Sequence, residues 1–235
     1  MRVSLFVPCF VDQLAPQIAV ATARVLERLG HNLHLPLGQT CCGQPALNAG
    51  HFPEALHLAR HQLEALGGGD PEAVVSPSGS CVAALRVLAP RHLGLDHPLL
   101  DRIFEFSQFL VEETGQVDVG ASFEGRLTWH DACHPTRLLG IREGPRRLLA
   151  AVRGLELVEM ESSDECCGFG GTFAMKFPAI SSGIGARKVD QILASGADAV
   201  ASTEPSCLMQ IGGLLERRGS RVRALHLAEI LAGER

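Results

Sequence analysis

The chain has 235 residues, a length that fits one large domain or two small ones. Hydrophobic residues make up 46% and charged residues 20%, which is ordinary for a globular protein and excludes extensive disorder. The formal net charge of −5 is accompanied by no basic tract, so we expect no nucleic-acid partner. No apolar run reaches the roughly 18 residues of a membrane helix, and no signal peptide is evident. We therefore expect a cytoplasmic protein with no direct membrane span.

The first half of the chain predicts alternating strands and helices. A short apolar segment at residues 3–7 predicts a buried strand, and helical spacing of apolar residues over 18–29 predicts a helix that Gly30 ends. Further elements are expected at residues 33–35, 56–66, 74–76 and 104–110. Strands that alternate with helices indicate α/β architecture with a mostly parallel sheet.

The second half repeats these elements in the same order. They are expected at residues 127–130, 147–152, 155–158, 184–193, 200–202 and 225–231. We therefore predict two similar α/β domains, the first over residues 1–115 and the second over 127–235, joined by a Gly-containing linker at 116–126.

The eight cysteines form two sets with nearly the same spacing. The first set is Cys9, Cys41, Cys42 and Cys81, and the second is Cys133, Cys166, Cys167 and Cys207. Corresponding cysteines are 124, 125, 125 and 126 residues apart, which indicates an internal duplication. Groups that follow parallel strands gather at the carboxyl ends of those strands. We therefore expect the four thiols of each repeat to converge at one edge of its sheet.

Four converging thiols in each repeat indicate metal binding. Clustered cysteines in a cytoplasmic chain are more often metal ligands than disulfides. A [4Fe–4S] cluster takes four ligands, so eight cysteines match two clusters. Zinc is also held by four cysteines, although the chain has no C-x-x-C motif typical of structural zinc sites. Buried thiols without a metal are the third interpretation.

Glycine, histidine and basic residues surround the cysteines. Gly43 and Gly168 follow the cysteine pairs and allow a close backbone approach to a bulky cluster. His130 and His134 flank Cys133 and could ligate iron or donate a hydrogen bond to a cluster sulfur, but a histidine bonded to the backbone at a strand end is the simpler interpretation. Basic residues stand nearby at Arg137, Arg142, Arg146, Arg147 and Lys176. A carboxylate site is conceivable, but the simpler interpretations are a solvated helix face, an offset to the negative charge of a cluster, or a docking surface for an acidic partner.

Four segments of the sequence resemble one known family. They are residues 41–46, 77–81, 130–134 and 165–173. These segments are similar to the lactate utilization protein A family, which belongs to the cysteine-rich CCG-domain proteins together with the cysteine-rich component of heterodisulfide reductase and the iron–sulfur component of glycolate oxidase. The resemblance extends over residues 3–231, nearly the whole chain.

The resemblance implies an iron–sulfur electron-transfer subunit of a cytoplasmic system that oxidises L-lactate to pyruvate, and so a subunit of an oxidoreductase complex of the L-lactate dehydrogenase type. It implies two partner subunits, a larger ferredoxin-type iron–sulfur protein and a third small protein. All eight cysteines would hold one or two [4Fe–4S] clusters. The alternatives are a redox subunit like that of glycolate oxidase or heterodisulfide reductase with a catalytic cluster, and a scaffold that binds zinc.

The chain departs from the heterodisulfide reductase pattern at two positions. In that relative each repeat ends in C-x-x-C and has five cysteines. Ser78 and Glu204 occupy the first position of that motif here, which leaves four cysteines in each repeat. The resemblance to the disulfide-cleaving relative is therefore incomplete.

Overall fold

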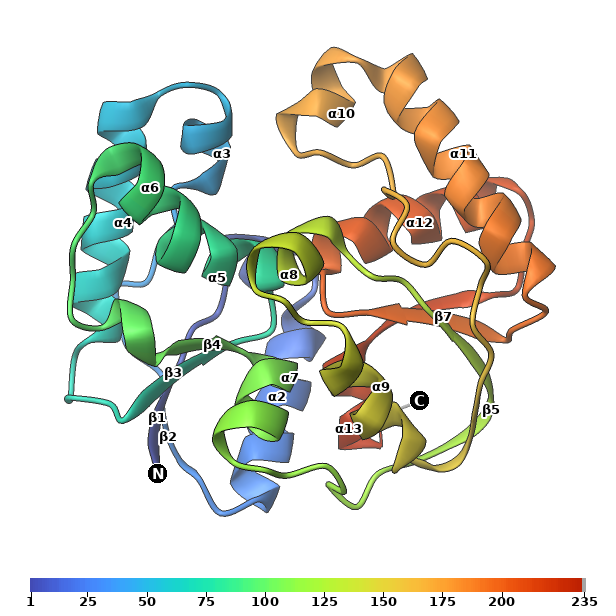
Figure 1. Cartoon of the computed structure of the whole chain (residues 1–235), viewed down its shortest axis with the longest axis horizontal. Coiled ribbons are helices and arrows are strands. Elements are labelled where there is room, and N and C mark those ends of the chain that lie inside the picture. The colour runs from blue at the N-terminus through green and yellow to red at the C-terminus, as the bar shows by residue number, and fades with distance from the viewer. Residues whose placement is uncertain (234–235) are drawn as a thin grey trace.

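The structure, a computed structural model, describes residues 1–233 and contains two parallel sheets of four strands each (Figure 1). The first sheet has the order β2-β1-β3-β4 and consists of β1 (Arg2–Leu5), β2 (Asn32–His34), β3 (Ala73–Ser76) and β4 (Ile103–Glu105). The second has the order β6-β5-β7-β8 and consists of β5 (Ser122–Trp129), β6 (Arg153–Leu157), β7 (Ala199–Ser202) and β8 (Arg223–His226). The identical order confirms the predicted pair of similar α/β domains.

The helices of the two repeats also correspond. Those of the first repeat are α1 (Cys9–Leu14), α2 (Pro16–Arg28), α3 (Gln44–Asn48), α4 (Phe52–Leu66), α5 (Gly79–Ala83), η1 (Ala84–Leu88), α6 (Ala89–Leu93), η2 (Leu100–Arg102), α7 (Phe106–Gln108) and η3 (Phe109–Glu113). Those of the second are α8 (Cys133–Leu138), α9 (Glu143–Ala150), α10 (Thr172–Lys176), α11 (Pro178–Ala194), α12 (Pro205–Arg217) and α13 (Leu227–Ala232). In residues 1–233, no helix has both the length and the apolar character needed to cross a membrane.

Each central strand is buried on both faces. In β1 and β3, Val3, Leu5 and Val75 point into a core between the two sheets, while Val74 points into a second core on the outer side of the first sheet. This alternation follows from the two-residue period of a strand. Because helices cover both faces, the strands are short apolar runs, as the sequence predicted.

The two repeats share one core and pack through equivalent elements. The core between the sheets takes Phe106 and Phe109 from the first repeat, and Trp129 and Leu227 from the second. Helix α13 packs against α2 as α9 packs against α7, and α12 packs against α1 as α5 packs against α8. Each pair uses one element from each repeat, which is the pattern of a two-fold interface between similar units.

Candidate metal centre

The four cysteines of the first repeat lie beyond the carboxyl ends of three neighbouring strands. Cys9 follows β1 and opens α1, Cys41 and Cys42 lie in the loop between β2 and α3, and Cys81 lies in the first turn of α5 after β3. Cys42 and Cys81 are buried, Cys41 is half-buried and Cys9 is exposed. The thiols therefore form a site with one side open to solvent.

The pKa values of Cys9, Cys41 and Cys42 depend strongly on the neighbouring thiols. Hydrogen bonds from Cys42 and Cys9 lower the pKa of Cys41 to about 3, and the Gly43 N–H, 3.4 Å from the Cys41 sulfur, acts in the same direction. Hydrogen bonding to Cys41, followed by burial, raises the pKa of Cys9, and contacts with Cys41 and Cys81 raise that of Cys42. Cys9 and Cys42 thus resist ionisation beside the Cys41 thiolate, and the positive charge of a metal centre would favour their thiolate forms.

The cysteines of the second repeat occupy the corresponding places. Cys133 opens α8 after β5, Cys166 and Cys167 precede α10, and Cys207 lies in the first turn of α12. The sulfur atoms of Cys167 and Cys207 are 3.0 Å apart, and Gly168 donates its N–H to the Cys166 sulfur at 3.3 Å. Burial, followed by the charge of Cys166, raises the pKa of Cys133. The structure thus brings together both predicted sets of four cysteines.

His130 faces two of these thiols without a hydrogen bond to its ring. A ring nitrogen of His130 and the sulfur atoms of Cys167 and Cys207 all lie within 4.8 Å of one another, and the residue is 1% exposed. Neither ring nitrogen makes a hydrogen bond of normal geometry, but the Ser163 backbone lies close enough to the ring to act as a weak acceptor that raises the pKa of His130. Burial, followed by the charge of Lys188, lowers the pKa of His130 to about 4, so the ring is neutral and has a free lone pair. The interpretation of His130 as a histidine bonded to the backbone at a strand end therefore stays a prediction, with the Ser163 carbonyl as the nearby acceptor.

His134 links the second site to the first repeat. Its Nδ1 is 3.5 Å from the Cys133 sulfur, and its Nε2 is 3.4 Å from the amide nitrogen of Gln44 in α3. Burial, followed by the charge of Arg137, lowers the pKa of His134. The two flanking histidines thus differ, because of the two only His130 lacks a hydrogen bond of normal geometry at its ring nitrogens.

The two residues that stand in place of a fifth cysteine contact each other across the domain boundary. The Ser78 hydroxyl lies 3.4 Å from Oε1 of Glu204, and Glu204 Oε2 accepts the Ser80 N–H at 2.9 Å. The Ser206 hydroxyl donates to Glu204 Oε1 at 3.0 Å. Burial raises the pKa of Glu204, which is 5% exposed. Glu204 therefore joins the repeats through the first turn of α5.

A buried ion pair holds the loop that leads to Cys166. Asp131 accepts hydrogen bonds from Arg146 Nη2 at 2.8 Å, from Ser163 Oγ at 2.7 Å and from Trp129 Nε1 at 2.9 Å. Arg146 also pairs with Glu159 at 2.7 Å. Arg146 is therefore committed within the protein, which corrects its interpretation as part of a solvated face or a carboxylate site.

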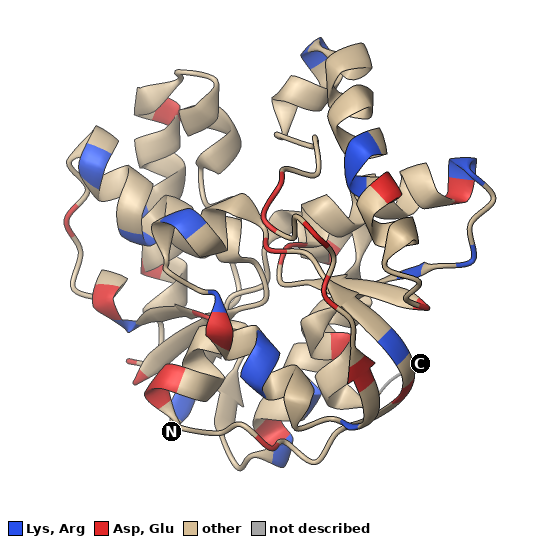
Figure 2. Ribbon diagram, turned by 45° about the vertical axis from the view of Figure 1, so that its right-hand side comes forward, with Lys and Arg blue, Asp and Glu red and all other residues tan. Residues whose placement is uncertain are grey.

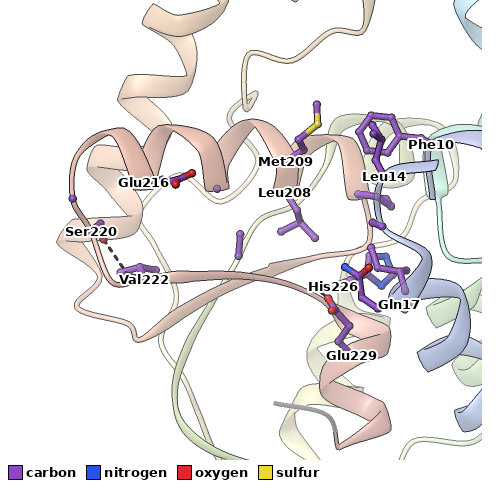
Figure 3. A pocket seen from close by; sticks show the side chains of 16 residues that line it. Phe10, Leu14, Gln17, Leu208, Met209, Glu216, Ser220, Val222, His226 and Glu229 are labelled. Carbon is purple, nitrogen blue, oxygen red and sulfur yellow. Dashed lines mark hydrogen bonds between the residues drawn. The ribbon is translucent and has the colours of Figure 1, made fainter. Parts of the chain in front are cut away.

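A pocket lies between the two repeats, beside the helices α1 and α12 that carry Cys9 and Cys207 (Figure 3). It has a volume of about 630 Å³ and lies between α1, which contributes Phe10, and α12, which contributes Met209 and Glu216. Glu229 of α13 also lines it, and none of the lining residues, all of which belong to the described part of the chain, is Lys or Arg. Because its charged side chains are carboxylates, it suits an anionic ligand poorly.

Sequence reasoning missed three groups that the structure places near the second site. The sequence marked Glu204 only as a departure from C-x-x-C, because its partner Ser80 is 124 residues away. The ion pair of Asp131 gave no signal, because Arg146 and Ser163 are 15 and 32 residues away. Lys188 did give one: it falls at helical spacing between Gly185 and Ile192, on the stripe that faces the core. A lysine on such a stripe is rarely buried without a partner.

Comparison with known proteins agrees with this architecture. The cysteine-rich domain family CCG matches residues 3–86 and 127–212, one match in each repeat. The chain is 43% identical over 238 residues to lactate utilization protein A of Exiguobacterium sp., covering 98% of this chain and 96% of that one. It is 41% identical over 239 residues to lactate utilization protein A of Bacillus cytotoxicus, covering 98% of each. The chain therefore belongs to the lactate utilization protein A family and contains two copies of the cysteine-rich CCG domain.

Proposed function

We propose that this protein takes part in lactate utilization as an iron–sulfur electron-transfer subunit, with metal centres held by Cys9, Cys41, Cys42 and Cys81 and by Cys133, Cys166, Cys167 and Cys207. The observation that carries the proposal is the convergence of four thiols at the same sheet edge in both repeats. Thiolates are the usual ligands of a [4Fe–4S] cluster, and bound clusters supply one-electron chemistry.

The residues around the thiols fit such a group. Gly43 and Gly168 direct backbone N–H groups at the sulfur atoms of Cys41 and Cys166, as hydrogen bonding to a cluster requires. His130 keeps an unpartnered ring nitrogen beside the second set of thiols. It can serve as a further ligand or as a donor to a sulfur.

Lactate oxidation itself is assigned to a partner subunit. The pocket beside Phe10 is lined by Glu216 and Glu229, whose negative charges repel a carboxylate. Arg146 is already paired with Asp131 and is not free to bind one. In this proposal the partners are a ferredoxin-type iron–sulfur protein and a third small subunit in the cytoplasm. Cys9 and Cys166 are exposed, so both sites have an edge that a partner can approach.

A zinc-binding scaffold is the second candidate. The compact grouping of His130, Cys167 and Cys207 within 4.8 Å has the dimensions of a single tetrahedral ion, and two thiols with one imidazole suit zinc. In that case the second repeat would have a structural role and would not exchange electrons.

Metal analysis separates the two functions. The protein is purified without oxygen, and iron, sulfide and zinc are measured together with EPR spectra before and after reduction. About eight irons per chain with a reducible signal supports two four-iron clusters. Stoichiometric zinc without iron contradicts the electron-transfer proposal. Cys9→Ser and Cys133→Ser, tested separately for growth on lactate, then determine whether each repeat is required.

A further inference from the structure

A buried lysine lies behind the cysteines of the second repeat. Lys188 projects from α11 and is 1% exposed. Its amino group donates to the carbonyl oxygens of Ser162 and Ser163, in the loop just before Cys166. Its charge acts on both Cys167 and His130, because it opposes protonation of His130 and interacts favourably with the Cys167 thiolate. Lys188 is thus coupled electrostatically to the site without being one of its ligands.

The contacts of Lys188 are those of an ammonium ion. Its Nζ faces the Ser162 carbonyl oxygen, the Ser163 carbonyl oxygen at 3.4 Å and the Met160 sulfur at 3.7 Å. All three are acceptors, and an ammonium group has three N–H donors while a neutral amine has two. Burial lowers the pKa of Lys188, but nearby acidic groups, led by Glu165, oppose that effect. The group therefore carries a positive charge in the folded protein.

The first repeat has a neutral residue at the same place. The buried positions of α4 recur 126 residues later in α11: Ala55, Ala59, Gln62, Leu63 and Leu66 correspond to Ser181, Gly185, Lys188, Val189 and Ile192. Gln62 accepts the Thr40 N–H at 2.6 Å and so holds the loop just before Cys41. Gln62 and Lys188 each hold the loop that precedes a cysteine pair, but only Lys188 adds a charge.

The acidic residues near Lys188 do not cancel that charge. Figure 2 shows acidic residues along the loop that leads to α10, beside basic residues of α11. The side chain of Glu165 is 34% exposed and is paired with Arg187, so water and its partner weaken its field. Asp131 is buried but is paired with Arg146. Asp164 is exposed, so water screens its charge. Glu204 is buried and acts on Cys207, but burial raises its pKa, which favours its neutral form.

We propose that Lys188 raises the reduction potential of the metal centre in the second repeat above that of the first, so that an electron shared between them resides in the second. In this transfer the first centre loses one electron and is oxidised, the second gains it and is reduced, and no proton moves. A buried positive charge favours the added electron, since net charge is one of the factors that set cluster potentials. The inference rests on the iron–sulfur function proposed above.

The test is a redox titration of the full chain, loaded with iron and followed by EPR. The two signals are assigned with Cys9→Ser and Cys133→Ser. Lys188→Gln places the first repeat's residue in the second. We expect it to lower the reduced-to-oxidised ratio of the second-repeat signal at fixed potential by about tenfold, which is 59 mV for a one-electron couple. The first-repeat signal should change by less than about threefold on the same scale.

Two control variants separate charge from packing. Lys188→Arg keeps the charge and should retain most of the wild-type potential. Arg187→Gln removes an exposed charge from the same helix, where the side chain is 73% exposed, and should leave both signals nearly unchanged. The inference is overturned if Lys188→Gln leaves the reduction potential of the second-repeat signal unchanged, or if Lys188→Arg lowers that potential as much as Lys188→Gln does.

A reciprocal variant covers the case in which Lys188→Gln does not retain iron. Gln62→Lys should raise the potential of the first-repeat signal, and an unchanged signal in iron-loaded Gln62→Lys protein would overturn the inference. Iron content separates the two proposals. Wild-type protein without iron contradicts the proposed function, whereas iron-loaded protein whose signals do not respond contradicts only the role of Lys188.

Discussion

Arg146→Met should destabilise the protein by removing one partner of a buried ion pair. The side chain of Arg146 is 20% exposed and that of Asp131 is 5% exposed. Breaking such a pair from one side costs about 3–5 kcal/mol, because it leaves an uncompensated buried charge. Trp129 and Ser163 would still donate to Asp131, so we expect the lower end of that range, about 3 kcal/mol.

The measurement is urea unfolding of reduced, metal-free protein, so that metal binding does not contribute to the free energy of unfolding. Arg187→Gln is the matched control, since it removes an exposed partner of Glu165 in the same loop and should cost less than about 1 kcal/mol. Equal losses for the two variants, or a loss below about 1 kcal/mol for Arg146→Met, would refute the reasoning.

The same ion pair predicts a pH dependence. Burial alone would raise the pKa of Asp131, but hydrogen bonds from Arg146 and Ser163 outweigh burial and hold this pKa below its usual value. The stabilisation is therefore present above the unfolded-state pKa, near 4 for an aspartate, and is lost as pH falls through the lower folded-state value. The difference in unfolding free energy between wild type and Arg146→Met should narrow below about pH 4.

Two further predictions concern the contact between the repeats and a buried acid. A Cβ on Gly79 would lie 2.3 Å from Cγ of Pro135, so Gly79→Ala should lower the free energy of unfolding in urea by about 1–3 kcal/mol. Gly213 on α12 has open space around it, so Gly213→Ala should leave the stability unchanged or raise it, and similar effects of the two variants would contradict the close packing at Gly79. Burial raises the pKa of Glu105 to about 7, so the wild type should lose about 3 kcal/mol of stability relative to Glu105→Gln as the pH rises from about 4.5 to 7. A difference in unfolding free energy that stays constant over this pH range would show that Glu105 ionises normally.

The sequence predicted the features that depend on local pattern and on repetition. The cysteine offsets indicated the duplication, and the apolar segments at residues 3–7 and 74–76 indicated buried parallel strands that end beside Cys9 and Cys81. Convergence of the thiols followed from the polarity of a parallel sheet. The strands and the convergence of the thiols need only residues within one repeat, and the duplication needs only the spacing of the cysteines in the two repeats.

The features that the sequence did not predict depend on contacts between the repeats or on distant pairs. The contact between Ser78 and Glu204 spans 126 positions, and nothing near either residue indicates it. The free ring of His130 depends on which acceptors fail to reach it, and local sequence does not contain that information. The sequence pattern therefore located the two sites, whereas the electrostatic differences between them follow from contacts in the folded structure.

The contact between Ser78 and Glu204 also bears on what a fused duplication permits. The two residues hold corresponding positions, and in a symmetric dimer of identical chains a residue on the two-fold axis meets its own copy. Two glutamates meeting there would repel each other in a buried setting, and two serines would leave the Ser80 N–H without its carboxylate. This restriction does not apply to a single chain, because the two positions are encoded separately and each can be substituted without the other. A fused duplication can therefore place two different residues in contact at the two-fold axis, which a homodimer cannot do.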